Sequence, residues 1–320
     1  MAVEHMRILV AGGAGFIGSH LVDRFLDRGD EVVVFDSFST GRHSNLEHSS
    51  KHDRCEVVEC DITEPLPGVG DVEAVINLAS PASPDDFASM PLEILEAGSV
   101  GNRRLLDLAR NCGARFLLAS SSEVYGESLV HPQSEDYWGN VDPIGPRSCY
   151  DEAKRFAEAT TMAYARRRGL DIRIARIFNT YGERLAPTDG RVVSAFVVQA
   201  LRGEPLSVYG DGAQTRSFCY VSDQVGGLVA LLDSACALPV NIGNPEEVTI
   251  AELAKLVISI VRPSSGITPV PLPERRTGDP YRRCPDINRA RSVLGWEPRV
   301  PLRDGVAAMV AYFLEHEDLG

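Results

Sequence analysis

The stretch Arg7-Ile8-Leu9-Val10-Ala11-Gly12-Gly13-Ala14-Gly15-Phe16-Ile17-Gly18 decides the fold. Its apolar start is typical of a buried strand, and the glycines at 12, 15 and 18 have the GxxGxxG spacing of a phosphate-binding turn. Residues 19–28 then show a helical pattern, which Gly29 ends. A helix that follows such a turn directs its free N–H groups and partial positive charge at an anion. The stretch therefore predicts the first strand, turn and helix of a dinucleotide-binding fold.

Five further runs rich in β-branched residues follow, separated by segments long enough for helices. They lie at residues 31–35, 56–60, 74–78, 116–120 and 171–176. This alternation predicts an α/β fold, a Rossmann-type doubly wound parallel sheet with helices on both faces.

The chain after about residue 179 differs, because it is richer in Pro and Gly and has helical patterns only at 250–261 and 302–316. We expect a smaller mixed α/β domain there, packed over the ends of the strands. Residues 1–178 and 216–243 are predicted to form the Rossmann domain, and residues 179–215 and 244–320 the substrate-binding domain.

Composition excludes several classes of function. The net charge of −13 argues against a nucleic acid or an anionic membrane as partner. No apolar run approaches the roughly 20 residues that span a bilayer. The seven cysteines are scattered without a CxxC motif, which favours reduced thiols and a cytoplasmic protein. The histidines show no metal-ligand spacing, so no metal site is expected.

The end of the second predicted strand carries Asp36, placed to accept hydrogen bonds from an adenosine ribose. A carboxylate repels a 2′-phosphate, so Asp36 favours NAD over NADP, although Arg42 nearby weakens the preference. Asp61-Ile62, after the third strand, fits either an adenine contact or a solvated strand end.

Tyr150 and Lys154 stand at positions i and i+4 of a predicted helix and therefore share a face. Ser148 and Asp151 have the pattern of a capping box that would start this helix. An ammonium and an oxidised nicotinamide beside Tyr150 would favour its phenolate, which could take a proton from a sugar hydroxyl. Ser120-Ser121-Ser122-Glu123-Val124-Tyr125-Gly126 ends the fifth strand, where its hydroxyls could bind the reacting oxygen.

These motifs resemble the extended short-chain dehydrogenases/reductases, the NAD-dependent epimerase/dehydratase family, which act on nucleotide-sugars. Three long stretches resemble the UDP-glucuronate decarboxylases within that family: residues 137–152, residues 175–182 together with 189–194, and residues 214–223. The resemblance covers nearly the whole chain.

The motifs and the resemblance together imply the site residues. The implied catalytic residues are Ser121, Ser122, Glu123, Tyr150, Lys154 and Arg283. Those for NAD are Gly12, Gly15, Phe16, Ile17, Gly18, Asp36, Ser37, Gly41, Asp61, Ile62, Leu78, Ser80, Tyr150 and Lys154. Those for a UDP-sugar are Pro81, Ser122, Glu123, Asn179, Arg191, Tyr209, Arg216 and Arg283.

The activity that this resemblance implies is oxidation of UDP-glucuronate at C4, loss of carbon dioxide, and hydride return to give UDP-xylose with NAD regenerated. A 4-epimerase that makes UDP-galacturonate is the alternative. Another nucleotide-sugar 4-epimerase, a 4,6-dehydratase or a non-catalytic NAD-binding regulator fits less well. The related dehydratases carry Asp-Glu where this chain has Ser122-Glu123. The regulators can lose the Tyr/Lys pair, which this chain retains. We also expect a homodimer formed through helices 98–112 and 150–168, each with apolar residues beyond the face that packs on the sheet.

The chain departs from the decarboxylase pattern at two places. Leu95-Glu96-Ala97-Gly98 stands where relatives usually carry Leu-Lys-Thr-Asn, and Arg283-Cys284-Pro285 stands where they carry Arg-Lys-Pro. Both departures are expected near the sugar pocket, where they would affect the fate of the oxidised intermediate.

Overall fold

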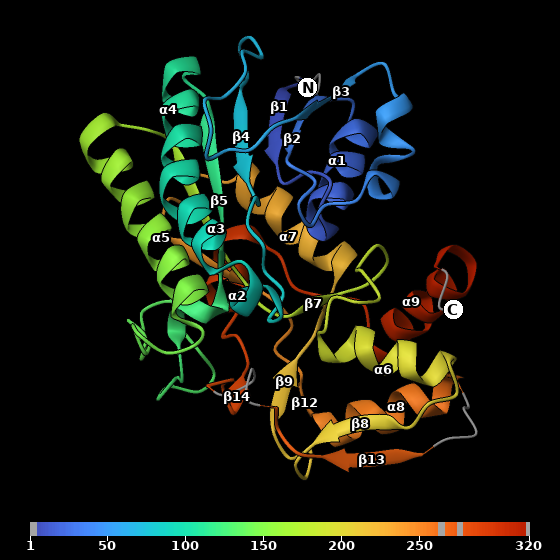
Figure 1. Cartoon of the computed structure of the whole chain (residues 1–320). Coiled ribbons are helices and arrows are strands. Elements are labelled where there is room, and N and C mark those ends of the chain that lie inside the picture. The colour runs from blue at the N-terminus through green and yellow to red at the C-terminus, as the bar shows by residue number, and fades with distance from the viewer. Residues whose placement is uncertain (1–4, 262–265, 274–277, 318–320) are drawn as a thin grey trace.

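The computed structural model describes residues 5–261, 266–273 and 278–317. Its centre is a seven-stranded, fully parallel sheet with the strand order β11-β6-β5-β4-β1-β2-β3 (Figure 1). The strands are β1 (Arg7–Ala11), β2 (Glu31–Asp36), β3 (Cys55–Glu59), β4 (Ala74–Asn77), β5 (Arg115–Ser121), β6 (Ile172–Ile177) and β11 (Pro239–Ile242). The α/β class and the six predicted strands are confirmed, each within one residue at either end, and β11 is an addition.

Helices cover both faces of the sheet. α1 (Phe16–Arg28) and α7 (Val221–Asp233) pack on one face, while α4 (Asn102–Cys112) and α5 (Ser148–Arg168) lie side by side on the other (Figure 1). Within β1, Ile8 and Val10 enter the first of these two cores, and Leu9 enters the second. A strand buried on both faces must be apolar throughout, which explains why this strand could be predicted from the sequence.

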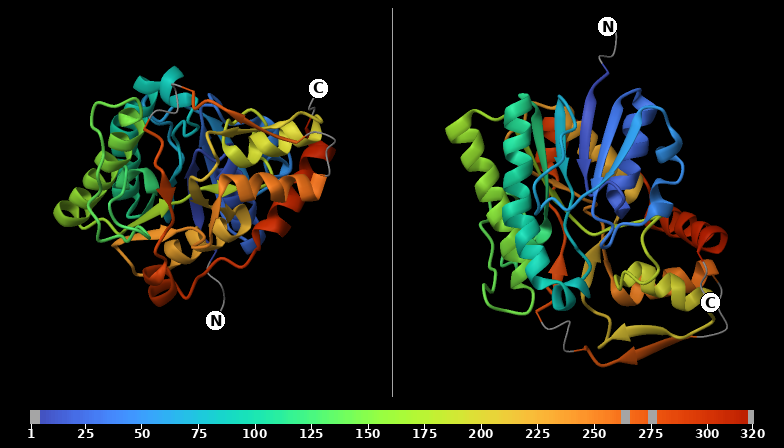
Figure 2. Two further views of the ribbon diagram at one scale, coloured as in Figure 1. Left: turned by 90° about the horizontal axis from the view of Figure 1, so that it is seen from below. Right: turned by 45° about the horizontal axis from the view of Figure 1, so that its top comes forward.

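The later part of the chain forms a smaller α/β region beyond the carboxyl ends of the strands (Figures 1 and 2). Its core gathers apolar side chains from α6 (Val192–Leu201), α8 (Ile250–Val261) and α9 (Leu302–His316). Its short strands pair as β10-β7, β12-β9-β14 and β13-β8. They are β7 (Thr180–Tyr181), β8 (Leu206–Tyr209), β9 (Thr215–Ser217), β10 (Cys219–Tyr220), β12 (Glu247–Thr249), β13 (Ile267–Val270) and β14 (Arg282–Arg283).

The boundary between the two parts is not a single cut in the chain. β11 returns to the large sheet, and Ala290 and Trp296 pack in the core under α1 and α7. The predicted boundaries between a Rossmann domain and a substrate-binding domain therefore remain a prediction. Short helical turns complete the fold: η1 (His43–Leu46), η2 (Ser49–Lys51), α2 (Asp86–Ser89), α3 (Pro91–Glu96), η3 (Ala97–Gly101), η4 (Ser122–Tyr125) and η6 (Ala290–Leu294).

The order of the strands places the site. From β1 the chain builds outward through β2 and β3, and it then crosses to the other side of β1 to begin β4. At such a switch point the loops after the two central strands part, and ligands of open α/β sheets bind in the crevice between them. Here the parting loops start at Gly12 and Leu78.

The capping-box prediction for α5 is wrong. Ser148 is the first helical residue, Arg147 is the N-cap, and no side chain caps this end. The carbonyl of Arg147 instead accepts hydrogen bonds from the N–H groups of Tyr150 and Asp151. The Arg147 side chain points into the site described below.

The helix predicted at 98–112 begins as a π-helical turn, η3, and continues as α4. The outer side of α4 is polar, contrary to the prediction. The large exposed apolar side chains in this part of the molecule are Leu92 and Leu95 on α3, and Phe156 on α5.

No helix in the described part of the chain is both long and apolar enough to cross a membrane. All seven cysteines are free thiols.

Candidate active site

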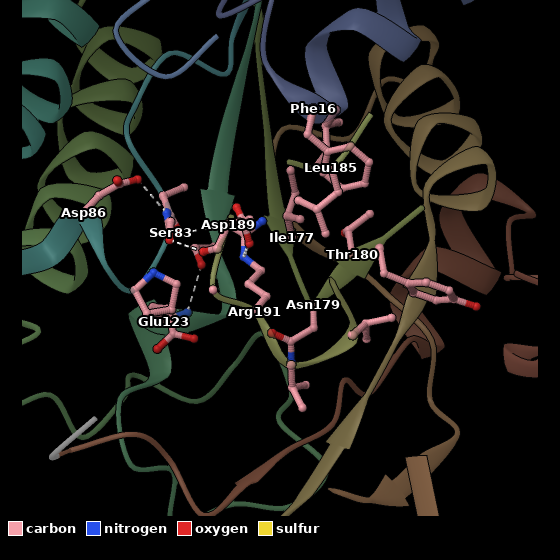
Figure 3. Close-up of a pocket in the computed structure, with 18 of the residues that line it drawn as sticks. Phe16, Ser83, Asp86, Glu123, Ile177, Asn179, Thr180, Leu185, Asp189 and Arg191 are labelled. Carbon is pink, nitrogen blue, oxygen red and sulfur yellow. Dashed lines mark hydrogen bonds and ion pairs between the residues drawn. The ribbon is translucent and has the colours of Figure 1, made fainter. Parts of the chain in front are cut away.

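A cavity of about 400 Å³ opens at the switch point, between the ends of the strands and the smaller region. Its walls come from the glycine turn, the β5 end, the first turn of α5 and the loop after β7 (Figure 3). A volume of this size is typical of small-molecule sites.

The glycine turn fits a close backbone approach and tolerates no side chain. Gly12 has φ +80°, and a Cβ there would lie 2.8 Å from the Leu78 carbonyl carbon. A Cβ on Gly18 would lie 2.0 Å from the Gly12 oxygen. Gly15 is the N-cap of α1 and lines the cavity, so the unpaired N–H groups of this helix face the space where a diphosphate would lie.

Asp36 is fixed at the end of β2. Its carboxylate accepts hydrogen bonds from the N–H groups of Ala14 and Phe38, both at 2.8 Å. Burial raises the pKa of Asp36, although the two hydrogen bonds oppose the rise. The carboxylate holds the glycine turn in place and retains acceptor capacity for a ribose hydroxyl.

Tyr150 and Lys154 lie together on α5, as predicted. Both are 7% exposed, and the Lys154 Nζ lies 5.5 Å from the centre of the Tyr150 ring. Tyr150 stacks on Phe87 at 4.9 Å and shares a hydrogen bond with Ser121. The Lys154 ammonium donates to the Ala119 carbonyl at 3.0 Å. The pair is thus held at the carboxyl end of β5, next to the serine segment.

Burial shifts the two pKa values in opposite senses. It raises the pKa of Tyr150 to about 12, although the hydrogen bond with Ser121 opposes the rise. It lowers the pKa of Lys154 to about 8. Both shifts favour the neutral form of each group, so added positive charge is needed to make Tyr150 an effective base.

Glu123 lies within a cluster of arginines in the same cavity. Its Oε2 accepts hydrogen bonds from Arg147 at 2.7 Å and from Arg283 at 3.3 Å. Burial alone would raise the pKa of Glu123, but the charges of Arg283 and Arg147 outweigh burial and lower it. Glu123 is therefore ionised at neutral pH. Arg147 also forms an ion pair with Asp279.

Arg283 and Arg216 occupy matching positions on the neighbouring strands β14 and β9. Arg283 is 1% exposed, and its Nε and Nη1 have no hydrogen-bond partner within the described chain. Burial and the nearby Arg283 charge lower the pKa of Arg216. Buried guanidinium donors without partners are costly, so this end of the cavity is prepared for an anion.

A wall that the sequence did not reveal joins the loop after β4 to the loop before α6 (Figure 3). Arg191 donates to the Ala82 carbonyl at 2.7 Å, and the Ser83 hydroxyl donates to the Asp189 carbonyl. Asp86 in turn accepts from the Ser83 N–H at 3.0 Å. These contacts close the cavity around the Tyr150 side.

Most of the predicted site residues come together in the cavity lining. They are Gly12, Gly15, Phe16, Ile17, Gly18, Leu78, Ser80, Ser121, Ser122, Glu123, Tyr150, Lys154, Asn179, Arg191, Tyr209, Arg216 and Arg283. The structure leaves six outside that lining: Asp36, Ser37, Gly41, Asp61, Ile62 and Pro81. Of the residues that were missed, Arg147 lies within the quoted stretch 137–152 and directly precedes the helix with Tyr150, which was the available signal.

Both departures were expected near the sugar pocket, and their residues lie outside the cavity lining. Glu96 is exposed on α3, and Gly98 lies in η3, where a Cβ would be 2.7 Å from the Ala153 Cβ. Cys284 directs its thiol at the Pro245 carbonyl, 3.3 Å away. None of the three lines the cavity.

Comparison with known proteins agrees with this geometry. Residues 9–309 match the family described as GDP-mannose 4,6 dehydratase. UDP-glucuronic acid decarboxylase 1 of Danio rerio is 51% identical over 317 residues, which are 98% of this chain and 75% of the relative.

Two solved structures are similar over nearly their whole length. A UDP-glucose 4-epimerase from Thermotoga maritima with UDP-glucose has a TM-score of 0.88 at 30% identity, covering 98% of this chain and 100% of that one. A UDP-glucuronic acid 4-epimerase from Bacillus cereus, in complex with UDP-glucuronic acid and NAD, has a TM-score of 0.84 at 28% identity, covering 97% and 99%.

Proposed function

Because this chain belongs to the GDP-mannose 4,6 dehydratase family, and within it to the UDP-glucuronic acid decarboxylases, we propose that it converts UDP-glucuronate to UDP-xylose and carbon dioxide. NAD is the proposed cofactor and is regenerated in each turnover. The observation that carries the proposal is the juxtaposition of the Tyr150/Lys154 pair with the unpartnered donors of Arg283 in one cavity.

The glycine turn and Asp36 fit NAD. The cradle of Gly12 and Gly18 leaves no room for side chains, and the α1 N-terminus faces the cavity, which suits a pyrophosphate. Leu78 and Ser80 line the wall that continues from this turn. NAD held by these residues would supply the hydride acceptor for oxidation at C4 and, once reduced, the hydride donor for the final step.

Oxidation at C4 requires a base for the hydroxyl proton. Tyr150 serves as that base, with the Lys154 ammonium stabilising its phenolate and Ser121 sharing the hydrogen bond to the reacting oxygen. The product of this step is a 4-ketone whose C5 bears the uronic carboxylate, a β-keto acid.

Decarboxylation then breaks the C5–C6 bond and leaves the electron pair in an enolate. The enolate oxygen accepts hydrogen bonds from protonated Tyr150 and from Ser121, which lowers the barrier. One proton adds at C5 before the hydride returns to C4, so the overall reaction consumes one proton and releases carbon dioxide. Glu123 is ionised between Arg147 and Arg283. Its role is therefore to position these arginines and not to serve as a general acid.

The decisive experiment incubates the purified protein with UDP-glucuronate and NAD and weighs the product. Loss of about 44 mass units, with no net change in NADH absorbance, supports the proposal. An isobaric product inverted at C4 would instead identify a 4-epimerase, the activity named for the Bacillus cereus structure. Stoichiometric NADH would identify an ordinary dehydrogenase.

We further propose that the chain forms a homodimer through α3 and α5. Leu92 and Phe156 are 68% and 55% exposed on these helices, which pack against each other in the monomer. Pairing with a second copy would remove both side chains from water.

A further inference from the structure

The three-stranded sheet β12-β9-β14 has two faces with different chemistry. Side chains alternate across a strand, and residues paired between neighbouring strands share a face. Arg283 pairs with Arg216, and both line the cavity. Arg282 pairs with Thr215, and Glu247 pairs with Ser217, so these residues lie on the opposite face.

Three potential metal ligands meet on that opposite face. One ligand atom each from His131, Glu247 and Cys284 lies within 4.8 Å of the other two. The three residues come from a loop, from β12 and from the position after β14, so nothing in their sequence spacing signals a site. We propose that His131, Glu247 and Cys284 bind one borderline-soft divalent cation of the Zn²⁺ class.

The types of ligand suit such a cation. An imidazole nitrogen, a thiolate and a carboxylate oxygen are ligands that zinc takes at about 2.0 to 2.3 Å, so its ligand atoms lie roughly 3.5 Å apart. The His131 Nε2 and Glu247 Oε2 are already 3.1 Å apart. The Cys284 thiol lies within 4.8 Å of the other two ligand atoms and would have to leave the Pro245 carbonyl, to which it donates at 3.3 Å, to close the set. A water molecule would take the fourth position.

Apart from the contact of Cys284 with Pro245, the groups around the cluster leave the ligands available. The His131 Nδ1 is buried and has no hydrogen-bond partner within the described chain. Arg282 reaches the Glu247 Oε2 at 3.3 Å, but its side chain is 50% exposed and can turn into solvent. Thr215 donates to the other carboxylate oxygen and fixes its orientation, as outer hydrogen bonds do in metal sites.

Charge also favours a cation here. Cysteine coordinates a metal as the thiolate, so binding requires the Cys284 thiol to lose its proton to solvent. A divalent cation would displace that proton and balance the thiolate and the carboxylate together. The bound cation would join His131 and β12 to the residue next to Arg283, and so brace the sheet that carries the two cavity arginines.

Cobalt titration of the metal-stripped full chain tests the proposal without any use of activity. We expect one Co²⁺ per chain with a thiolate-to-Co²⁺ charge-transfer band, and displacement of that cobalt by Zn²⁺. Cys284→Ser should abolish the band, and His131→Gln should weaken Co²⁺ binding at least tenfold.

The matched control is Cys55→Ser, because Cys55 is also a free thiol and lies on β3, away from the cluster. The band should persist in this variant. Absence of the band in the wild-type protein overturns the proposal even if a variant does not fold. Persistence of the band in Cys284→Ser, or its loss in Cys55→Ser, overturns it as well.

Discussion

Replacement of Lys154 by Met tests the electrostatics of the proposed base. With a pKa of about 12, Tyr150 is about five units from ionisation at pH 7, a free-energy cost of about 7 kcal/mol. An ammonium 5.5 Å from the ring centre recovers about 3 kcal/mol at an effective dielectric constant of about 20. Lys154→Met should therefore raise the pKa of the base by about two units and slow turnover at pH 7 about 100-fold.

The pH profile separates this role from a purely structural one. The pKa of Lys154 is lowered to about 8, so its charge is present below that pH and is lost as the pH rises through it. In the wild-type enzyme the reaction rate should therefore rise with pH as Tyr150 is deprotonated and level off above about pH 8. In Lys154→Met the rate should keep rising about tenfold per pH unit, because no second group titrates.

The assay is single-turnover release of carbon dioxide from UDP-glucuronate between pH 6 and pH 10, with saturating NAD. Lys154→Arg is the matched control, since it keeps the charge and should retain most of the rate. A Lys154→Met profile parallel to that of the wild type, lowered uniformly, would refute the electrostatic argument and leave Lys154 as a binding residue.

Three further variants test other parts of the site. Tyr150→Phe should reduce kcat about 100-fold or more while UDP-glucuronate binding, measured by calorimetry, is retained, because only the base is removed; a near-normal kcat would contradict this role. Glu96→Lys should leave kcat/KM within about twofold, because Glu96 is exposed outside the cavity; a larger change in steady-state kinetics would put this residue back in the site. Phe156→Glu should convert the proposed dimer to a monomer in sedimentation velocity, and a wild-type monomer at micromolar concentration would remove the proposal.

The parts that sequence predicted well are those set by local chemistry. β1 is apolar on both faces, and Gly12 and Gly18 are required because a Cβ at either position would lie 2.0 to 2.9 Å from backbone atoms. Local sequence therefore predicted both the strand and the turn. Tyr150 and Lys154 share a helix face by spacing alone.

The parts that sequence did not predict depend on contacts between distant segments. Ser83 meets Asp189 only because two loops converge over the cavity. Cys284 directly follows the cavity residue Arg283 in sequence, yet its side chain lies on the opposite face of the sheet. Sequence could not predict this, because the face of each residue is known only once the register of β14 with β9 is known. Arg147 is the N-cap of α5 in place of Ser148, and its side chain pairs with Glu123 and Asp279, which lie far from it in sequence.

The arginine cluster of the cavity gives a physical reason to expect an anionic substrate. Arg283 is buried with two donor nitrogens unpaired, and Glu123 is already shared between Arg283 and Arg147. The diphosphate or the carboxylate of a UDP-uronic acid would supply the missing acceptors, and we propose that one of these two groups pairs with Arg283. Sites that contain unmatched polar groups discriminate more strongly than apolar pockets do, because the wrong substrate bears the desolvation cost without the compensating bonds. The same positive charge that would bind the anionic substrate also raises the cost of folding the empty site, and the ion pairs of Glu123 and Asp279 with the arginines offset part of that cost.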